Sequence, residues 1–172
     1  MRRLGIIVAL CTLLGMVGGV ATSTPALAGR GPQWEVVTAQ PFTLPAAFCG
    51  FRVRVAFPVN KAYDKVLKSS DGFEITLATG EVRVLYTNLR TGKAVTENVS
   101  GQAKVTTRPD GSVTEADRGH TGVFLPADLA RRSGLPRVGV TAGSITVSVA
   151  ADGSLTFSFR GHVLVDVCAA LR

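Results

Sequence analysis

Hydrophobic and polar residues alternate along most of the chain from Cys49 onward. Apolar side chains take every second position in five stretches: 51–57, 82–87, 145–149, 155–159 and 163–167. A period of two is typical of β-strands with one buried face. A further strand is predicted at 34–38, before this region. With the segments that flank the turns described next, the pattern predicts roughly eight or nine strands.

Aspartate–glycine pairs mark the turns between these strands. They begin at Asp71, Asp110 and Asp152, and the last two lie in similar contexts, 108–112 and 150–154. Each of these two fits a three-residue loop in which glycine takes the left-handed position and forms a bulge. A two-residue loop would mix apolar and polar faces, so the hydrophobic pattern selects the bulged turn. The resulting register opposes Val149 to Leu155, Val147 to Phe157 and Ile145 to Phe159.

The same register places three polar side chains on apolar faces. The turn at 108–112 opposes Glu115 to Val105. By alternation, Glu97 shares a face with its apolar neighbours at 95 and 99, and Tyr86 with those at 82 and 84. A carboxyl group in an apolar cavity has a raised pKa and can act as a general acid or base. Tyr86, Glu97 and Glu115 are therefore the candidate catalytic residues. The alternative is that they lie at a rim and contact water.

One short helix is predicted at 126–134, which has Pro126 at its start and Gly134 at its end. Strands joined mostly by hairpins imply an all-β antiparallel fold. We favour a β-barrel of about eight or nine strands with this one helix, and the alternative is a β-sandwich. A cysteine at each end of the strand region favours the barrel, because first and last strands are neighbours in a closed sheet.

The first 28 residues have the three parts of a secretory signal peptide. Arg2 and Arg3 give a positive start, residues 4–21 are uncharged and apolar, and Ala26–Ala28 is a small-x-small cleavage site. We expect cleavage near Ala28 and a secreted, extracellular or cell-wall-associated protein, with no membrane attachment afterwards. Residues 29–48 form a proline-containing leader, and 49–172 form a single domain that we expect to be monomeric.

Two cysteines remain after this cleavage, Cys49 and Cys168. In an oxidising compartment, an even pair predicts one disulfide. The 119 positions between them and the lack of C-x-x-C spacing argue against a metal or redox site. His120 and His162 lie in no recognised ligand spacing, so we predict neither a metal nor a cofactor.

The chain has 19 basic and 12 acidic residues, and its basic residues are scattered singly along the predicted strands. A nucleic-acid-binding protein normally clusters its positive charge and interleaves aromatic residues. We therefore predict no nucleic-acid partner. Solvated strand faces explain the charge, and weak attraction to an anionic cell-wall polymer is the alternative.

Several short motifs occur in a fixed order between Cys49 and Arg172. They are Cys-Gly-Phe at 49–51, Thr-Asn-Leu-Arg-Thr-Gly-Lys at 87–93, Asn-Val-Ser-Gly at 98–101, Asp-Gly-Ser at 110–112 and Asp-Val-Cys-Ala-Ala-Leu at 166–171. In this order the chain resembles a group of uncharacterised actinobacterial secreted proteins. The resemblance implies a secreted domain with a Cys49–Cys168 bridge. It supplies no catalytic residue and no substrate.

The sequence contains no nucleophile elbow, no phosphate-binding glycine loop and no recognised catalytic triad. We therefore expect a non-catalytic secreted β domain that binds a small apolar ligand, or a cell-envelope or protein partner. The alternative is a small lyase, isomerase or cyclase that uses the inward carboxylates. A pocket among the candidate residues would favour ligand binding or catalysis, and a filled interior would favour an interaction role.

Overall fold

The computed structural model describes residues 33–69 and 71–172 of the chain. Nine antiparallel strands and two short helices make up the described part, which confirms the all-β prediction. The predicted signal peptide lies outside the described residues. The elements are β1 (Glu35–Val37), β2 (Phe42–Leu44), β3 (Val53–Lys68), β4 (Glu74–Asn88), β5 (Ala94–Asn98), β6 (Gly101–Thr107), β7 (Val113–Phe124), α1 (Ala127–Ser133), β8 (Val138–Val149), β9 (Leu155–Asp166) and α2 (Val167–Ala170).

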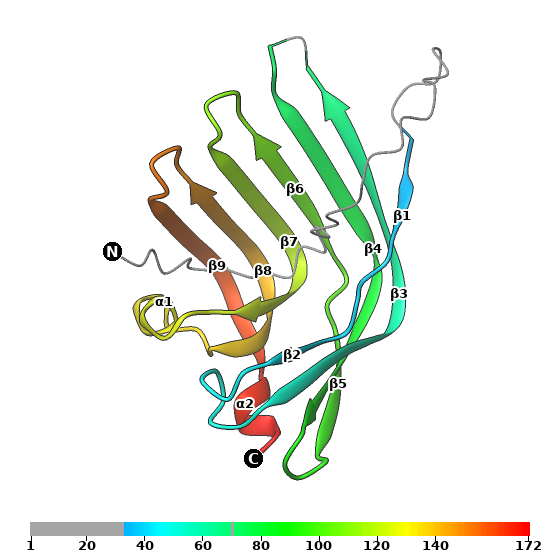
Figure 1. Cartoon of the computed structure of the whole chain (residues 1–172), viewed down its shortest axis with the longest axis vertical. Helices are drawn as coiled ribbons and strands as arrows, with labels where there is room; N and C mark the ends of the chain where they lie inside the picture. Colours follow the sequence, from blue (N-terminus) through cyan, green and yellow to red (C-terminus); the bar gives the residue numbers. More distant parts are fainter. Residues whose placement is uncertain (1–32, 70) are drawn as a thin grey trace.

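The strands form one open, strongly curved sheet in the order β1-β3-β4-β6-β7-β8-β9 (Figure 1). β2 pairs with β3, and β5 pairs with β4. Among the described strands, no ladder joins β9 to β1 or β3, so the sheet is not closed. The closed barrel that we favoured is therefore not formed, and the open sheet agrees better with the sandwich alternative. Two strands of the expected leader, β1 and β2, pair with β3 and belong to the sheet.

The two matching hairpins have the predicted geometry. Arg108 N–H donates to Ser112 O at 2.9 Å, and Ala150 N–H donates to Ser154 O at 2.9 Å. In each turn the aspartate carboxylate accepts the N–H of the serine two residues later, at 2.8 Å. These hydrogen bonds hold the pKa values of Asp110 and Asp152 below the ordinary value. The predicted pairs Val149–Leu155, Val147–Phe157 and Ile145–Phe159 are all formed.

A row of glycines crosses the middle of the sheet, one from each of β4, β6, β7, β8 and β9: Gly80, Gly101, Gly119, Gly143 and Gly161. A Cβ on Gly143 would overlap the carbonyl oxygen of Arg160, and its φ is +139°. Glycine at such positions lets strands bend sharply and approach closely. In Figure 1, β7 turns toward α1 after this row. The sequence pattern breaks here, which is why it predicts separate strands at 155–159 and 163–167, although residues 155–166 form the single strand β9 and Val167 begins α2.

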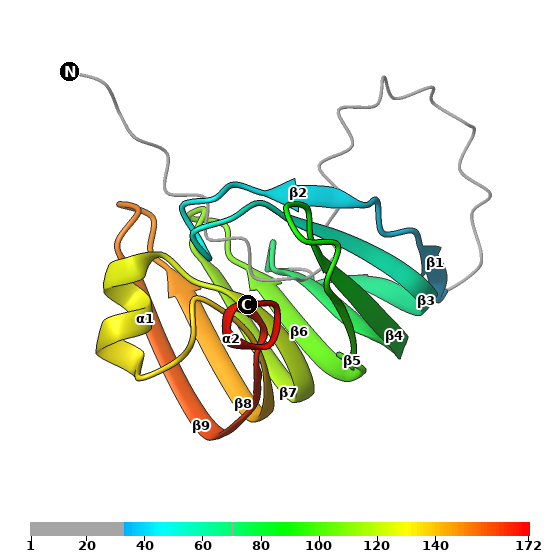
Figure 2. The same ribbon diagram turned by 90° about the horizontal axis from the view of Figure 1, so that it is seen from below.

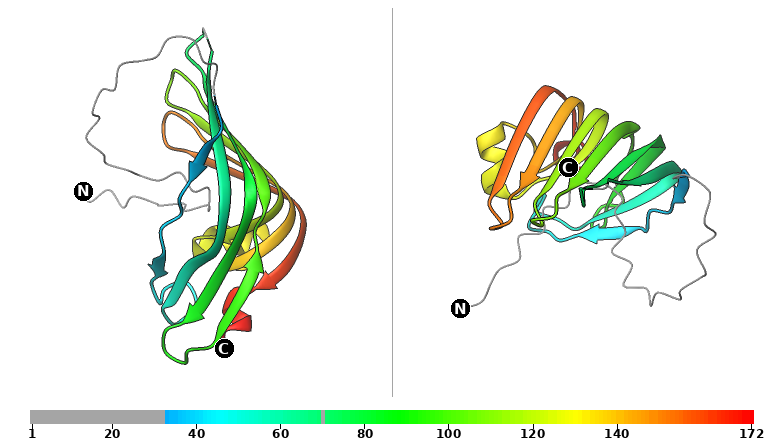
Figure 3. Two further views of the ribbon diagram at one scale, coloured as in Figure 1. Left: turned by 90° about the vertical axis from the view of Figure 1, so that its right-hand side faces the viewer. Right: turned by 90° about the horizontal axis from the view of Figure 1, so that it is seen from above.

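The glycine row divides the sheet into two parts. We call the part on the side of the three long hairpin tips the open half: β1 and residues 62–68, 74–79, 102–107, 113–118, 144–149 and 155–160. We call the part on the other side the closed half: β2, β5, α2 and residues 53–60, 82–88, 120–124, 138–142 and 162–166. In the closed half, side chains of β3 and β4 pack in one core with those of β7, β8 and α2. The closed half is therefore folded onto itself like a small sandwich, while the open half is a curved single sheet that α1 covers at β8 and β9 (Figure 3).

Residues 122–125 and 138–141 are continuously buried, in contrast to the alternation elsewhere. Phe124 packs into the core with β3 and β4, whereas its neighbour Val123 packs into a second core with α1. A strand that is buried on both faces has a continuous apolar run instead of alternation. Helix α1 follows Pro126 and ends at Gly134, as predicted. It covers Ile145 and Val147 of β8, and Figure 2 shows it beside β8 and β9.

The predicted disulfide joins Cys49 to Cys168, with their Cα atoms 5.1 Å apart. Cys49 precedes β3, and Cys168 lies in α2, directly after β9. Asp166 caps this helix by accepting the Ala169 N–H at 3.0 Å. The bridge therefore connects the two ends of the sheet without any strand pairing between them. This explains why the cysteine positions led to the wrong expectation of a closed barrel.

Candidate functional site

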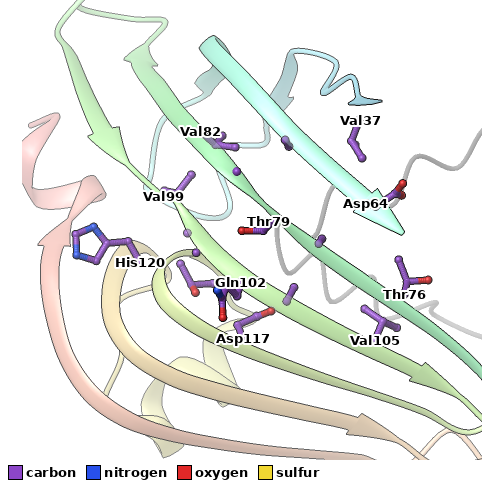
Figure 4. A pocket seen from close by; sticks show the side chains of 17 residues that line it. Val37, Asp64, Thr76, Thr79, Val82, Val99, Gln102, Val105, Asp117 and His120 are labelled. Atoms are coloured by element: carbon purple, nitrogen blue, oxygen red, sulfur yellow. The ribbon is translucent and has the colours of Figure 1, made fainter. Parts of the chain in front are cut away.

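A pocket of about 100 Å³ lies on the concave face of the sheet, beside the glycine row (Figure 4). β1, β3, β4, β6 and β7 all contribute to its wall. Most of its side chains are small or apolar: Val37, Ala62, Thr76, Ala78, Thr79, Val82, Val99, Ala103, Val105 and Thr121. Asp64, Gln102, Asp117 and His120 supply its other polar groups. The volume suits a small ligand or one end of a longer ligand.

The hollow exists because small residues meet where the sheet divides. β4 pairs with β6 as far as Thr79–Gln102, and then with β5 from Arg83–Asn98. Between these ladders, the Ser100 hydroxyl accepts the Val82 N–H at 3.0 Å. Gly122 of β7 approaches this break, and a Cβ there would lie 3.2 Å from the Tyr86 hydroxyl oxygen. Larger side chains at these positions would fill the space.

Asp117 is the distinctive group in this pocket. It lies on β7 between Ala103 of β6 and Ile145 of β8, and it is 5% exposed. No described residue forms a hydrogen bond or a salt bridge with its carboxyl group. Burial, with a smaller contribution from the nearby charge of Glu115, raises the pKa of Asp117 to about 7. Near neutral pH, this carboxyl can therefore both gain and lose a proton.

Charge is separated between the two faces of the open half. The face that carries Asp117 also carries Glu35, Asp64, Glu74 and Glu115 by register, and Lys68 is its single basic side chain among the described residues. Lys68 lies near the hairpin tip, 3.7 Å from Glu74. The opposite, convex face carries the exposed cations Lys104, Arg118 and Arg160, on β6, β7 and β9. Within the open half, these basic residues that are scattered along the sequence thus lie on one face.

Tyr86, Glu97 and Glu115 all lie on the faces that the register predicted. Tyr86 is fully buried in the core of the closed half, where its ring centroid is 6.4 Å from that of Phe124. Glu97 of β5 lies opposite Val84 of β4 and is half-buried. Glu115 lies opposite Val105 in the open half. None of the three belongs to the wall of the pocket, and their catalytic role stays a prediction.

Sequence analysis missed Asp117 as the carboxyl group of the pocket. The signal was present, because residues 115 and 117 alternate in the same strand and the predicted register opposes Asp117 to Ala103. His120 was also missed as a wall residue. Its Nδ1 atom is buried and has no hydrogen-bond partner among the described residues.

Within residues 33–69 and 71–172, no three histidine, cysteine or acidic side chains are grouped so that they could hold a metal ion. The helices of this part are also too short or too polar to span a membrane. Comparisons with protein-family models, with curated proteins and with solved structures found no match for this chain. The resemblance to actinobacterial secreted proteins therefore stays a prediction.

Proposed function

We propose that this domain binds a small, mainly apolar ligand in the pocket on its concave face. The observation that carries the proposal is a hollow with apolar and small walls that also contains one buried carboxyl group, Asp117. Binding sites in proteins are typically concave and mostly apolar, with a few polar groups that orient the ligand. We also propose that the protein acts outside the cytoplasm, and the Cys49–Cys168 disulfide supports this location.

Binding is better supported than catalysis. A lyase, isomerase or cyclase of the predicted kind would use Tyr86, Glu97 or Glu115 within hydrogen-bond reach of the reacting group. Tyr86, Glu97 and Glu115 lie outside the pocket wall, and the phenol of Tyr86 is enclosed by the core of the closed half. Asp117 could exchange a proton, but in Figure 4 the His120 ring is turned away from it and Asp64 lies across the pocket.

A titration with 1-hexanol, a neutral short-chain probe, tests ligand binding. We expect saturable NMR shifts of the methyl groups of Ala78, Ala103 and Val105, which line the pocket. Native mass spectrometry of protein secreted into culture medium would then identify a retained natural ligand.

Two alanines provide a matched pair of variants for this titration. Ala103→Leu fills the pocket and should abolish the saturable shifts. Ala116→Leu adds the same volume on the opposite face of the sheet and should leave them unchanged. If hexanol and other short apolar probes gave no saturable shift in the folded wild-type protein, the proposed function would be wrong.

The convex face favours a second candidate function, which is attachment to an anionic envelope polymer. Lys104, Arg118 and Arg160 are exposed on this face, and no described carboxylate forms a salt bridge with any of them. A concentration of one charge on a surface attracts polymers of the opposite charge. Linear polyphosphate should bind at low salt and dissociate at high salt. Reversing Lys104 and Arg118 to glutamate should abolish this binding, whereas reversing Arg131 and Arg132 of α1 should not.

A further inference from the structure

We infer that the ligand of the concave pocket carries a positively charged amine, which forms an ion pair with Asp117. The inference rests on the proposed function and identifies the chemical class of the ligand. It follows from the position of the carboxyl group and from the charges around it.

Asp117 is buried in a wall of small and apolar side chains, and it faces a cavity that a ligand can enter. A buried carboxylate is costly unless it is paired or hydrogen-bonded. Sequences can satisfy such a group with a lysine, arginine or hydroxyl from a neighbouring strand. Here the flanking strands place Ala103 and Ile145 beside it instead. Asp117 therefore has no counter-ion from the described part of the protein.

The other charged groups near the pocket are also mostly acidic. Glu115 lies on the same strand, and Asp64 of β3 belongs to the pocket wall. Glu35 of β1 lies opposite Asp64, and Lys68 of β3 is near Glu74 of β4 at the hairpin tip. β6, β8 and β9 place no charged side chain on this face in the open half.

Two further elements contain groups that can carry positive charge. His120 of β7 lies in the pocket wall. Helix α1 packs through Leu129 and Ala130, while its charged residues at 128, 131 and 132 are exposed. An amine on the ligand would therefore supply the charge that this region lacks. The apolar walls would hold the rest of the ligand.

This arrangement has a consequence for pH. An ammonium group pairs with the ionised form of Asp117, and burial raises the pKa of this group to about 7. Amine binding should therefore strengthen as the pH rises from 5.5 to 8. At higher pH, less free energy is needed to remove the proton from Asp117 before the ion pair forms. A neutral ligand of the same shape should show the opposite trend or none.

The decisive experiment compares 1-hexylamine with 1-hexanol by NMR titration at pH 8 and pH 5.5. The amine stays protonated at both values, and the two probes differ at one end only. At pH 8 we expect hexylammonium to bind the wild-type protein about tenfold more tightly than hexanol, as a charge-assisted hydrogen bond allows. At pH 5.5 this preference should largely disappear.

Asp117→Asn should remove the preference for the amine while hexanol still binds, and its retained hexanol binding shows that the pocket is intact. Ala116→Leu, on the opposite face of the sheet, should keep both the preference and its pH dependence. Equal affinities for the two probes at pH 8, or an unchanged preference in Asp117→Asn, would overturn the inference and leave the proposed function standing. Binding of neither probe would instead refute the proposed function itself.

Discussion

The two halves of the sheet are built mostly from the same strands, but their apolar side chains are buried to different extents. In the closed half, two groups of strands pack against each other, and Val53, Tyr86 and Val140 are fully buried. In the open half, the same strands form one sheet layer, which α1 covers at β8 and β9, and Val66 and Val149 are 41% and 36% exposed. The closed half thus supplies most of the packing, and the open half keeps a concave surface that can receive a ligand.

The largest expected effect comes from removing the aromatic side chain at the centre of the closed half. Tyr86→Ala should lower the free energy of unfolding by about 3–5 kcal/mol, because it leaves a cavity in a packed core. Val149→Ala in the open half should cost less than about 1 kcal/mol, since that side chain is 36% exposed. Urea denaturation of both variants measures the difference. Similar losses in the two variants would show that the halves do not differ in packing as described.

Removing the disulfide should have the next largest effect. The double substitution Cys49→Ser and Cys168→Ser should cost roughly 2–5 kcal/mol, because the bridge closes a loop of most of the domain. Since the bridge ties the ends of the closed half, hydrogen exchange should accelerate there first. Equal acceleration at the hairpin tips of the open half would contradict a local role. Urea denaturation and exchange of the same sample provide the two measurements.

Asp117 should make the stability of the protein depend on pH in an unusual direction. Its pKa is about 7 in the folded chain against an ordinary value of 3.8, so the folded state binds more protons between these values. The free energy of unfolding should therefore fall as the pH rises from 4 to 8, by roughly 2–4 kcal/mol from this group. Asp117→Asn should flatten the profile in this window. A wild-type profile that rises from pH 4 to pH 8 while that of Asp117→Asn is flat would contradict the assignment.

The glycine row that separates the halves should be sensitive to a single added methyl group. Gly143→Ala should cost about 1–3 kcal/mol, because the new Cβ would overlap the Arg160 carbonyl oxygen and force the strands apart. Gly153→Ala, at a turn where no atom lies within 4 Å of the added Cβ, should cost about 1 kcal/mol through its positive φ alone. Thermal unfolding of the two variants ranks them. A larger loss at Gly153 would mean that the row is not a point of close approach.

The sequence by itself determined the local structure of this protein. Alternation located the strands, and the twin turns at 108–112 and 150–154 fixed their register, because a shift of one residue would have exposed every apolar side chain. Proline and glycine bounded α1, and the cysteine count identified the disulfide. These features depend on residues that are neighbours in the chain, through backbone geometry and the burial of one face.

Tertiary structure alone decided how the sheet is shaped and where its pocket lies. The five glycines look like strand breaks along the chain, and only their alignment across the sheet makes them a bend. The pocket depends on that bend and on the divergence of β5 from β6, so Asp117, and not Tyr86, Glu97 or Glu115, lies in its wall. Period and turn type place a side chain on a face. What covers that face is set by contacts between residues far apart in the chain, which local patterns do not encode.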